Sequence, residues 1–169
     1  MQQTPESNVP ISIFYSYSHR DKAYQSKLKT HLSLMRRQGL ISEFSDQDIM
    51  PGQVWTDEIN KHLRTADVIL LLVSSDFLDS EYCYTKEMEL AIQRHDAGEA
   101  CIIPIVLRPC DWKNSPLSRF HALPHRGKPV VKWTPQDEAF DDIAKGIRRV
   151  INSLQFTQEQ RGDQGNPQR

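Results

Sequence analysis

The sequence predicts an α/β protein built on an open parallel sheet of five strands, with helices packed on both faces. Short apolar segments alternate along the chain with helical patterns, which is typical of parallel sheets with crossover helices. The apolar segments 68–73 and 102–107 carry no polar side chain on either face, as expected for strands that helices cover on both sides. Right-handed crossovers then favour the flavodoxin-like strand order 2-1-3-4-5.

The first half of the chain shows this alternation clearly. Residues 11–17 are β-branched and aromatic, which favours a strand. Residues 21–38 carry apolar side chains at helical spacing and precede Gly39, a common residue at the end of a helix. Residues 40–44 form a weaker strand pattern, and the polar segment 45–52 ends in a Pro-Gly turn signal.

The second half repeats the alternation and ends in the clearest helix. Residues 137–154 keep the helical period with apolar side chains from Phe140 to Leu154. Residues 108–127 are irregular and contain several prolines, and a short strand is predicted at 129–133. The remaining predicted elements are, in order, a helix at 55–63, a strand at 67–74, a helix at 80–96 and a strand at 101–107.

The length of 169 residues suits one domain, which needs no disulfide or metal ion for its stability. We expect a disordered N-terminal end over 1–9, a domain over 10–155 and a polar tail or linker over 156–169. With 21 Lys and Arg against 22 Asp and Glu, the net charge of -1 argues against a nucleic-acid partner. An odd number of cysteines, the absence of a signal peptide and the absence of a long apolar run predict a cytoplasmic protein without a membrane segment.

The expected binding edge lies beyond the carboxyl ends of the strands, where the strand order reverses. That point follows the first strand, at Ser16, Tyr17 and Ser18, and the third strand, at 74–76. The sequence contains no GxGxxG, GxxxxGK[ST], GxSxG or HExxH motif, so it predicts no redox nucleotide cofactor, ATP site, serine-hydrolase elbow or zinc site. The acidic pocket of a phosphorelay receiver, which would hold Mg²⁺, is also missing.

The helix predicted at 80–96 begins near this edge and carries two candidate carboxylates. Glu87 and Glu89 each lie about 100° from Met88 on a helical wheel, beside the buried stripe. A carboxylate in the first turns of this helix can overhang the cleft, although most helix glutamates are solvated. Wheel geometry alone leaves Glu87 and Glu89 as alternatives.

Three short segments carry a resemblance to a known family. Residues 13–21 read IFYSYSHRD, residues 46–52 read DQDIMPG, and residues 74–87 read SSDFLDSEYCYTKE. In this order and spacing, they resemble the first box, the BB loop and the glutamate-bearing segment of Toll/interleukin-1 receptor (TIR) domains of the bacterial and plant-like kind. Two details depart from the family pattern: Tyr82-Cys83 replaces Trp-Cys, and Glu87 lies one residue further from the cysteine.

The resemblance implies an NAD⁺ glycohydrolase or cyclase, which cleaves the nicotinamide–ribose bond to give nicotinamide and ADP-ribose or a cyclic isomer. NAD⁺ is then the substrate, and neither a cofactor nor a metal ion is expected. Glu87 is the implied catalytic residue. Phe44 fits a pocket position and a core position equally well. The other implied residues are Tyr17, Ser18, Phe44 and Cys83 for substrate binding, and Asp46, Asp48, Pro51 and Gly52 for an assembly loop.

The expected partners are NAD⁺, other TIR domains in dimers or filaments, and a further domain after Arg169. The resemblance implies a role in bacterial innate immunity against phages, activated by self-assembly. Two alternatives stay open: a non-catalytic module that binds other TIR domains, and a mimic that interferes with host signalling. Consumption of NAD⁺ separates the enzyme from the other two.

Overall fold

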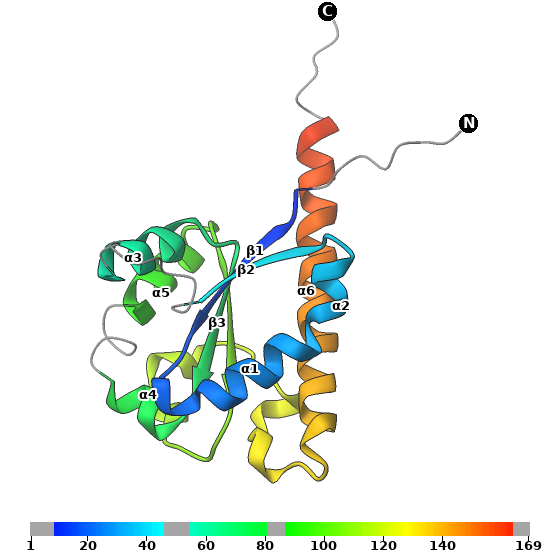
Figure 1. The fold of residues 1–169 in the computed structure, drawn as a ribbon. Coiled ribbons are helices and arrows are strands. Elements are labelled where there is room, and N and C mark those ends of the chain that lie inside the picture. Colours follow the sequence, from blue (N-terminus) through cyan, green and yellow to red (C-terminus); the bar gives the residue numbers. More distant parts are fainter. Residues whose placement is uncertain (1–8, 46–54, 81–86, 164–169) are drawn as a thin grey trace, which may run out of the picture.

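A parallel sheet forms the centre of the molecule (Figure 1). The structure, a computed structural model, describes residues 9–45, 55–80 and 87–163. Within this part of the chain the sheet has four strands in the order β2-β1-β3-β4, and every neighbouring pair is parallel. This confirms the predicted fold class and the predicted order of these strands. The strands are β1 (Ile11–Ser16), β2 (Ile41–Phe44), β3 (Val68–Val73) and β4 (Cys101–Val106).

Helices cover both faces of the sheet. Figure 1 shows α1, α2 and α6 on one face and α3 and α5 on the other, while α4 lies near the carboxyl ends of the strands. The helices are α1 (Lys22–His31), α2 (Ser33–Arg37), α3 (Trp55–Thr65), α4 (Ser75–Asp79), α5 (Met88–Asp96) and α6 (Gln136–Asp163).

Two apolar layers hold these helices on the sheet. Alternate residues of β1 point to opposite faces, so Ile13 and Tyr15 pack with α1 and α6 whereas Phe14 packs with α3 and α5. Every side chain of β3 is fully buried, as the uniformly apolar sequence predicts for a central strand. The two layers fix the carboxyl ends of β1 and β3 side by side, because Ser16 pairs with Leu71.

The fifth strand predicted at 129–133 is not formed. Val130–Lys132 is a turn of 3₁₀ helix instead. Its backbone contact with the chain at the end of β4 is one hydrogen bond, which the Val131 N–H donates to the carbonyl of Leu107 at 3.2 Å. The position beside β4 is taken by a single bridge between Ile105 and Leu123. Pro104, in the middle of β4, has no N–H to offer a neighbouring strand, which explains why pairing at this edge stays so short.

Several helix boundaries differ from the predicted ones. The helix predicted at 21–38 is divided into α1 and α2 at Leu32, where the backbone leaves helical geometry (φ -92°, ψ 2°). Ser80, predicted to begin a helix, is extended; residues 81–86 lie outside the described residues, and α5 is described from Met88. The unpredicted helix α4 begins where the Ser74 hydroxyl accepts the Phe77 N–H at 3.1 Å, a side-chain N-cap.

The last helix is longer than the sequence indicates. α6 continues to Asp163, past the predicted end at Leu154, and Figure 1 shows its last turns extending beyond the sheet. The side chains of residues 156–162 are exposed, which explains why no apolar periodicity marks this part of the helix. Within the described residues, no helix has the length and apolar character needed to span a bilayer.

Candidate functional site

A buried carboxylate and a buried hydroxyl meet at the carboxyl edge of the sheet. Ser16 is the last residue of β1, and Glu87 directly precedes α5. Both are almost fully buried, with exposed fractions of 1% and 4%. The Ser16 hydroxyl donates a hydrogen bond to Oε2 of Glu87. A buried carboxylate needs such donors, so the end of β1 holds this side chain in one orientation at the edge where ligands bind to such sheets.

A second polar network lies at the same edge and joins four segments. The Ser74 hydroxyl donates to Asp21, whose carboxylate is 1% exposed. Arg108, which follows β4, donates from Nη2 to Oδ1 of Asp21 at 2.8 Å and to Oδ2 of Asp76 at 2.6 Å. Nε of Arg20 lies 3.7 Å from Oδ1 of Asp76. The network therefore ties the exits of β1, β3 and β4 together around one guanidinium group.

The two carboxylates stabilise the positive charge of the Arg108 guanidinium group. Its hydrogen bond to Asp76 raises the pKa of Arg108 above its ordinary value, and the charge and hydrogen bond of Asp21 add to this effect, while partial burial opposes it. Arg108 therefore stays cationic between two carboxylates. Its role at this edge is to compensate their charge and fix their positions.

The residues predicted to bind substrate are not all gathered on one face. Tyr17 packs into the core layer beneath α1 and α6. Phe44 lies in the opposite layer, stacked between Phe14 at 6.0 Å and His62 at 3.5 Å between ring centroids. Ser18 caps the 3₁₀ turn His19–Asp21, and its hydroxyl accepts the Arg20 N–H at 3.4 Å. Their roles in binding stay predictions, whereas their packing and capping roles are visible.

Five further predicted residues lie outside the described part of the chain. These are Cys83 of the substrate-binding set and all four of the assembly loop, Asp46, Asp48, Pro51 and Gly52.

The two candidate carboxylates of the sequence differ sharply in burial. Glu89 lies in the first turn of α5 and is exposed, whereas Glu87 is buried against the end of β1. Wheel geometry could not separate them because both flank the same stripe. Arg108 was missed as a member of the edge, and nothing in the sequence singles it out. Ser16 was placed at this edge from its position at the end of the first strand, but its contact with Glu87 was not predicted.

The described residues contain no cluster of His, Cys, Asp and Glu that could hold a metal ion. Cys101 and Cys110 are free thiols. Burial raises the pKa of both above its ordinary value, so neither is a reactive thiolate near neutral pH.

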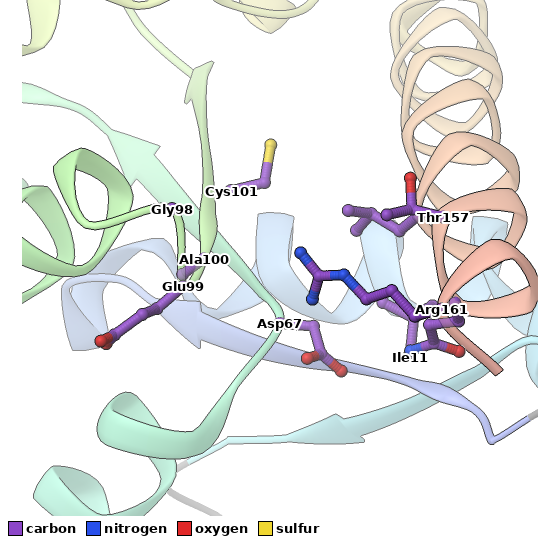
Figure 2. A pocket seen from close by; sticks show the side chains of 10 residues that line it. Ile11, Asp67, Gly98, Glu99, Ala100, Cys101, Thr157 and Arg161 are labelled. Carbon is purple, nitrogen blue, oxygen red and sulfur yellow. The ribbon is translucent and has the colours of Figure 1, made fainter. Parts of the chain in front are cut away.

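A cavity of about 260 Å³ lies at the opposite, amino edge of the sheet (Figure 2). Figure 2 shows Arg161 of α6 reaching toward Asp67 and Cys101 across this cavity. Asp67 already accepts hydrogen bonds from the backbone N–H and the hydroxyl of Ser12, at 2.9 and 3.0 Å. This carboxylate therefore joins β3 to β1, and the cavity lies away from Ser16 and Glu87.

Comparison with known proteins agrees with this architecture. A family model described as the TIR domain matches residues 13–149. An uncharacterised protein of Sinorhizobium fredii, y4lF, is 46% identical over 146 residues, which are 86% of this chain and 45% of that protein. The chain thus spans less than half the length of this relative.

Two solved structures share the fold at low sequence identity. The TIR domain of the Toll-related receptor TRR-2 from Hydra magnipapillata superposes with a TM-score of 0.58 at 20% identity, covering 80% of this chain and 97% of that domain. The TIR domains of the activated Roq1 resistosome, which recognises the pathogen effector XopQ, give a TM-score of 0.50 at 14% identity, covering 80% and 84%. The family match over most of the chain, together with the sheet order and helix arrangement, shows that this protein belongs to the TIR domain family.

Proposed function

We propose that this TIR domain is an NAD⁺ glycohydrolase or cyclase and that Glu87 is its catalytic residue. The observation that carries the proposal is the burial of Glu87 at the carboxyl edge of the sheet, hydrogen-bonded by Ser16, in a family that includes enzymes of this kind. The exposed Glu89 offers no comparable environment.

A single carboxylate suits the chemistry of this reaction. Nicotinamide leaves NAD⁺ as a neutral molecule, since the bond that breaks is to a positively charged nitrogen, so no general acid is required. The transition state resembles an oxocarbenium ion on the ribose, as in other glycosyl transfers. A carboxylate held close to the ribose stabilises the developing positive charge and accepts hydrogen bonds from the ribose hydroxyls. Attack by water gives ADP-ribose, and attack by a hydroxyl of the same molecule gives a cyclic isomer.

Ser16 has a positioning role in this proposal. Its hydroxyl donates to one carboxylate oxygen of Glu87 and so fixes the orientation of this side chain. Because Ser16 lies on a rigid strand within the sheet, the carboxylate is oriented before substrate binds.

The proposal includes activation by self-association. The TIR domains of Roq1 were solved within an assembled, activated resistosome. We infer that copies of this domain associate through the loop that contains Asp46, Asp48, Pro51 and Gly52, and that the enzyme serves bacterial defence against phages. Activity then rises with protein concentration, because an associated state is favoured by mass action.

The test is the loss of NAD⁺, followed by chromatography at high protein concentration, in the wild type and in three variants. Glu87→Ala is expected to lower kcat at least a hundredfold, since it removes the group that stabilises the transition state. Ser16→Ala is expected to lower kcat about ten- to a hundredfold with little change in KM, because the carboxylate remains but is less well oriented. Glu89→Ala is the matched control and keeps wild-type turnover.

Melting curves of all four proteins accompany the assay, so that lost activity is separated from lost folding. Wild-type turnover in a folded Glu87→Ala variant would refute the role of Glu87. If the wild type consumes no NAD⁺ at any concentration, the enzyme proposal fails and a non-catalytic interaction module replaces it.

A further inference from the structure

A cavity of about 490 Å³ opens beside the first half of β4, away from the carboxyl edge. It lies between β4, the segment that contains Arg119 and Arg126, and α6. The cavity exists because the edge of β4 is paired only at Ile105, by Leu123, so no strand covers residues 101–103 on this side among the described residues. The Ile102 N–H at this edge donates to Nδ1 of His95 at 3.5 Å, so this donor already has a partner.

Basic side chains predominate around this cavity. Its walls include three arginines and three histidines but a single carboxylate, that of Asp142. The whole chain carries a net charge of -1, so this concentration of positive charge is local. The six basic residues come from α5, from the loop after β4 and from α6; they are His95, Arg119, His121, His125, Arg126 and Arg149.

Two of the arginines are available to a ligand. Arg119 pairs with Asp96 at 2.8 Å. Arg126 and Arg149 have no ion-pair partner within the described part of the protein. Asp142 does not compensate them with an ion pair, since its Oδ2 accepts the backbone N–H of His125 at 2.7 Å. Two guanidinium groups that line the cavity therefore have no carboxylate partner among the described residues.

Arg126 is held in a backbone conformation that side chains other than glycine rarely adopt. Its φ of 57° and ψ of 22° lie in the left-handed region, which is unfavourable for an arginine. The turn is fixed on both sides: the His125 N–H is bonded to Asp142, and a side chain at Gly127 would come within 2.9 Å of Trp112. Strain of this kind is found preferentially where a side chain must be presented to a ligand.

The remaining lining sets the kind of ligand. The floor is apolar and includes Ile103, Phe120 and Val150. A volume of about 490 Å³ falls in the range of pockets for small organic molecules rather than for a single inorganic ion. Guanidinium groups bind phosphate oxygens through paired hydrogen bonds, which makes arginine the preferred residue for phosphate recognition.

We propose that this cavity is a binding site for a phosphorylated small molecule of nucleotide size, with its phosphates on Arg126 and Arg149 and its apolar part on the floor beside Phe120. The site is separate from Glu87 and Ser16, which lie at the carboxyl edge of the sheet. The inference does not depend on the proposed enzymatic activity.

The test is calorimetric titration of the intact protein with ADP, adenosine and inorganic pyrophosphate. ADP is expected to bind. Adenosine, which lacks the phosphates, and pyrophosphate, which lacks the apolar part, are each expected to bind at least tenfold more weakly. Arg149→Ala and Arg126→Gly are each expected to weaken ADP binding at least tenfold, since each removes a charge-assisted contact. Arg126→Gly is the sharper variant, because glycine adopts the same backbone conformation without strain and should melt at least as high as the wild type.

Two controls locate the binding. Arg148→Ala changes the neighbouring arginine of α6, which contacts Gln38 at 3.1 Å and does not line the cavity, and it should leave ADP affinity within twofold. Glu87→Ala should also leave it unchanged. The proposal is overturned if ADP does not bind, if it binds equally well to folded Arg149→Ala and Arg126→Gly variants, or if Glu87→Ala alone removes binding. Equal affinity for pyrophosphate and ADP would also overturn it. So would an Arg149→Ala variant that binds ADP as tightly as the wild type but changes its oligomeric state, because the cavity would then serve an interface between copies.

Discussion

At the scale of single residues, Glu43 shows how burial and an ion pair compete at one side chain. Its side chain on β2 is only 3% exposed, and Nη1 of Arg36 lies 3.0 Å from Oε2. Burial raises the pKa of Glu43 above its ordinary value, and the attraction of Arg36 and Lys29 offsets this only in part. The neighbouring Tyr15 is also buried, and both its burial and the charge of Glu43 raise the pKa of Tyr15 well above its ordinary value.

This raised pKa predicts a pH-dependent stability. Between the ordinary pKa of a glutamate and the raised value, the folded protein binds more protons than the unfolded chain, so the free energy of unfolding falls as the pH rises through this window. Glu43→Gln removes the buried charge and still offers an oxygen to Arg36. We expect the variant to be more stable than the wild type near neutral pH, with a difference that disappears below about pH 4.

Urea unfolding at several pH values measures this difference, and Glu89→Gln, at an exposed position, serves as the control without an effect. A Glu43→Gln variant that is less stable near neutral pH would mean that the ion pair with Arg36 outweighs burial.

At the scale of elements, Arg108 connects segments that the chain places far apart. Its guanidinium joins Asp21, which follows β1, to Asp76 in α4, while Ser74 bonds Asp21 from the end of β3. The ends of these strands are thus held in place by side-chain hydrogen bonds as well as by the backbone hydrogen bonds of the sheet. The same edge carries the hydrogen bond between Ser16 and Glu87, so its geometry depends on this network.

Arg108→Ala is therefore expected to destabilise the fold. The change leaves the buried carboxylate of Asp21 without its cation, which costs about 2–3 kcal/mol; this is less than for a fully buried pair, because Arg108 is partly exposed and Ser74 still donates. Arg119→Ala removes the exposed pair with Asp96 and should cost less than about 1 kcal/mol. Denaturant unfolding of both variants gives the comparison, and equal effects would show that the network does not stabilise the edge.

The elements that sequence reasoning recovered are those whose pattern reflects burial. Strand β3 is apolar at every position because both of its faces are covered, and α6 repeats its apolar residues toward a single core layer. The strand predicted at 129–133 was wrong. β-branched residues favour a strand only where a partner strand is available, and Leu123 already occupies the edge of β4.

The candidate site was recovered less completely. Glu87 was singled out by resemblance, whereas its burial depends on how α5 meets β1, which no local pattern encodes. Ser16 has an ordinary strand-end sequence, and its role becomes visible only through its partner 71 residues away. Tyr17 and Phe44, both placed near the edge by sequence, lie in opposite core layers because the sheet separates them.

At the scale of the whole molecule, the charges are unevenly distributed although their sum is nearly zero. The carboxyl edge holds compensated carboxylates, whereas the cavity beside β4 holds uncompensated arginines. Helix α6 spans both the core and a projecting end: Ile147 and Ile151 are fully buried, whereas the side chains of residues 156–162 are exposed. The part of α6 that packs on the core therefore ends before the helix itself ends.

This difference predicts the effect of truncation. A chain of residues 1–156 should lose less than about 1 kcal/mol of unfolding free energy, because residues 157–162, which it gives up, have exposed side chains. A chain of residues 1–146 loses Ile147 and Ile151 from the core and should be destabilised by roughly 4 kcal/mol or more, enough to prevent folding of many domains. Circular dichroism and urea unfolding of both chains test this, and a large loss in the longer chain would contradict it.

Pro104 in β4 has a consequence for how copies of this protein can associate. A strand edge with free N–H and C=O groups invites further strands and can grow into an extended aggregate. At this edge the proline removes one donor, Leu123 takes up the nearby carbonyl and N–H groups, and His95 accepts the Ile102 N–H. These positions therefore offer no continuous backbone ladder to a second copy, and association through this side would depend on side-chain contacts, which are reversible and can be dismantled.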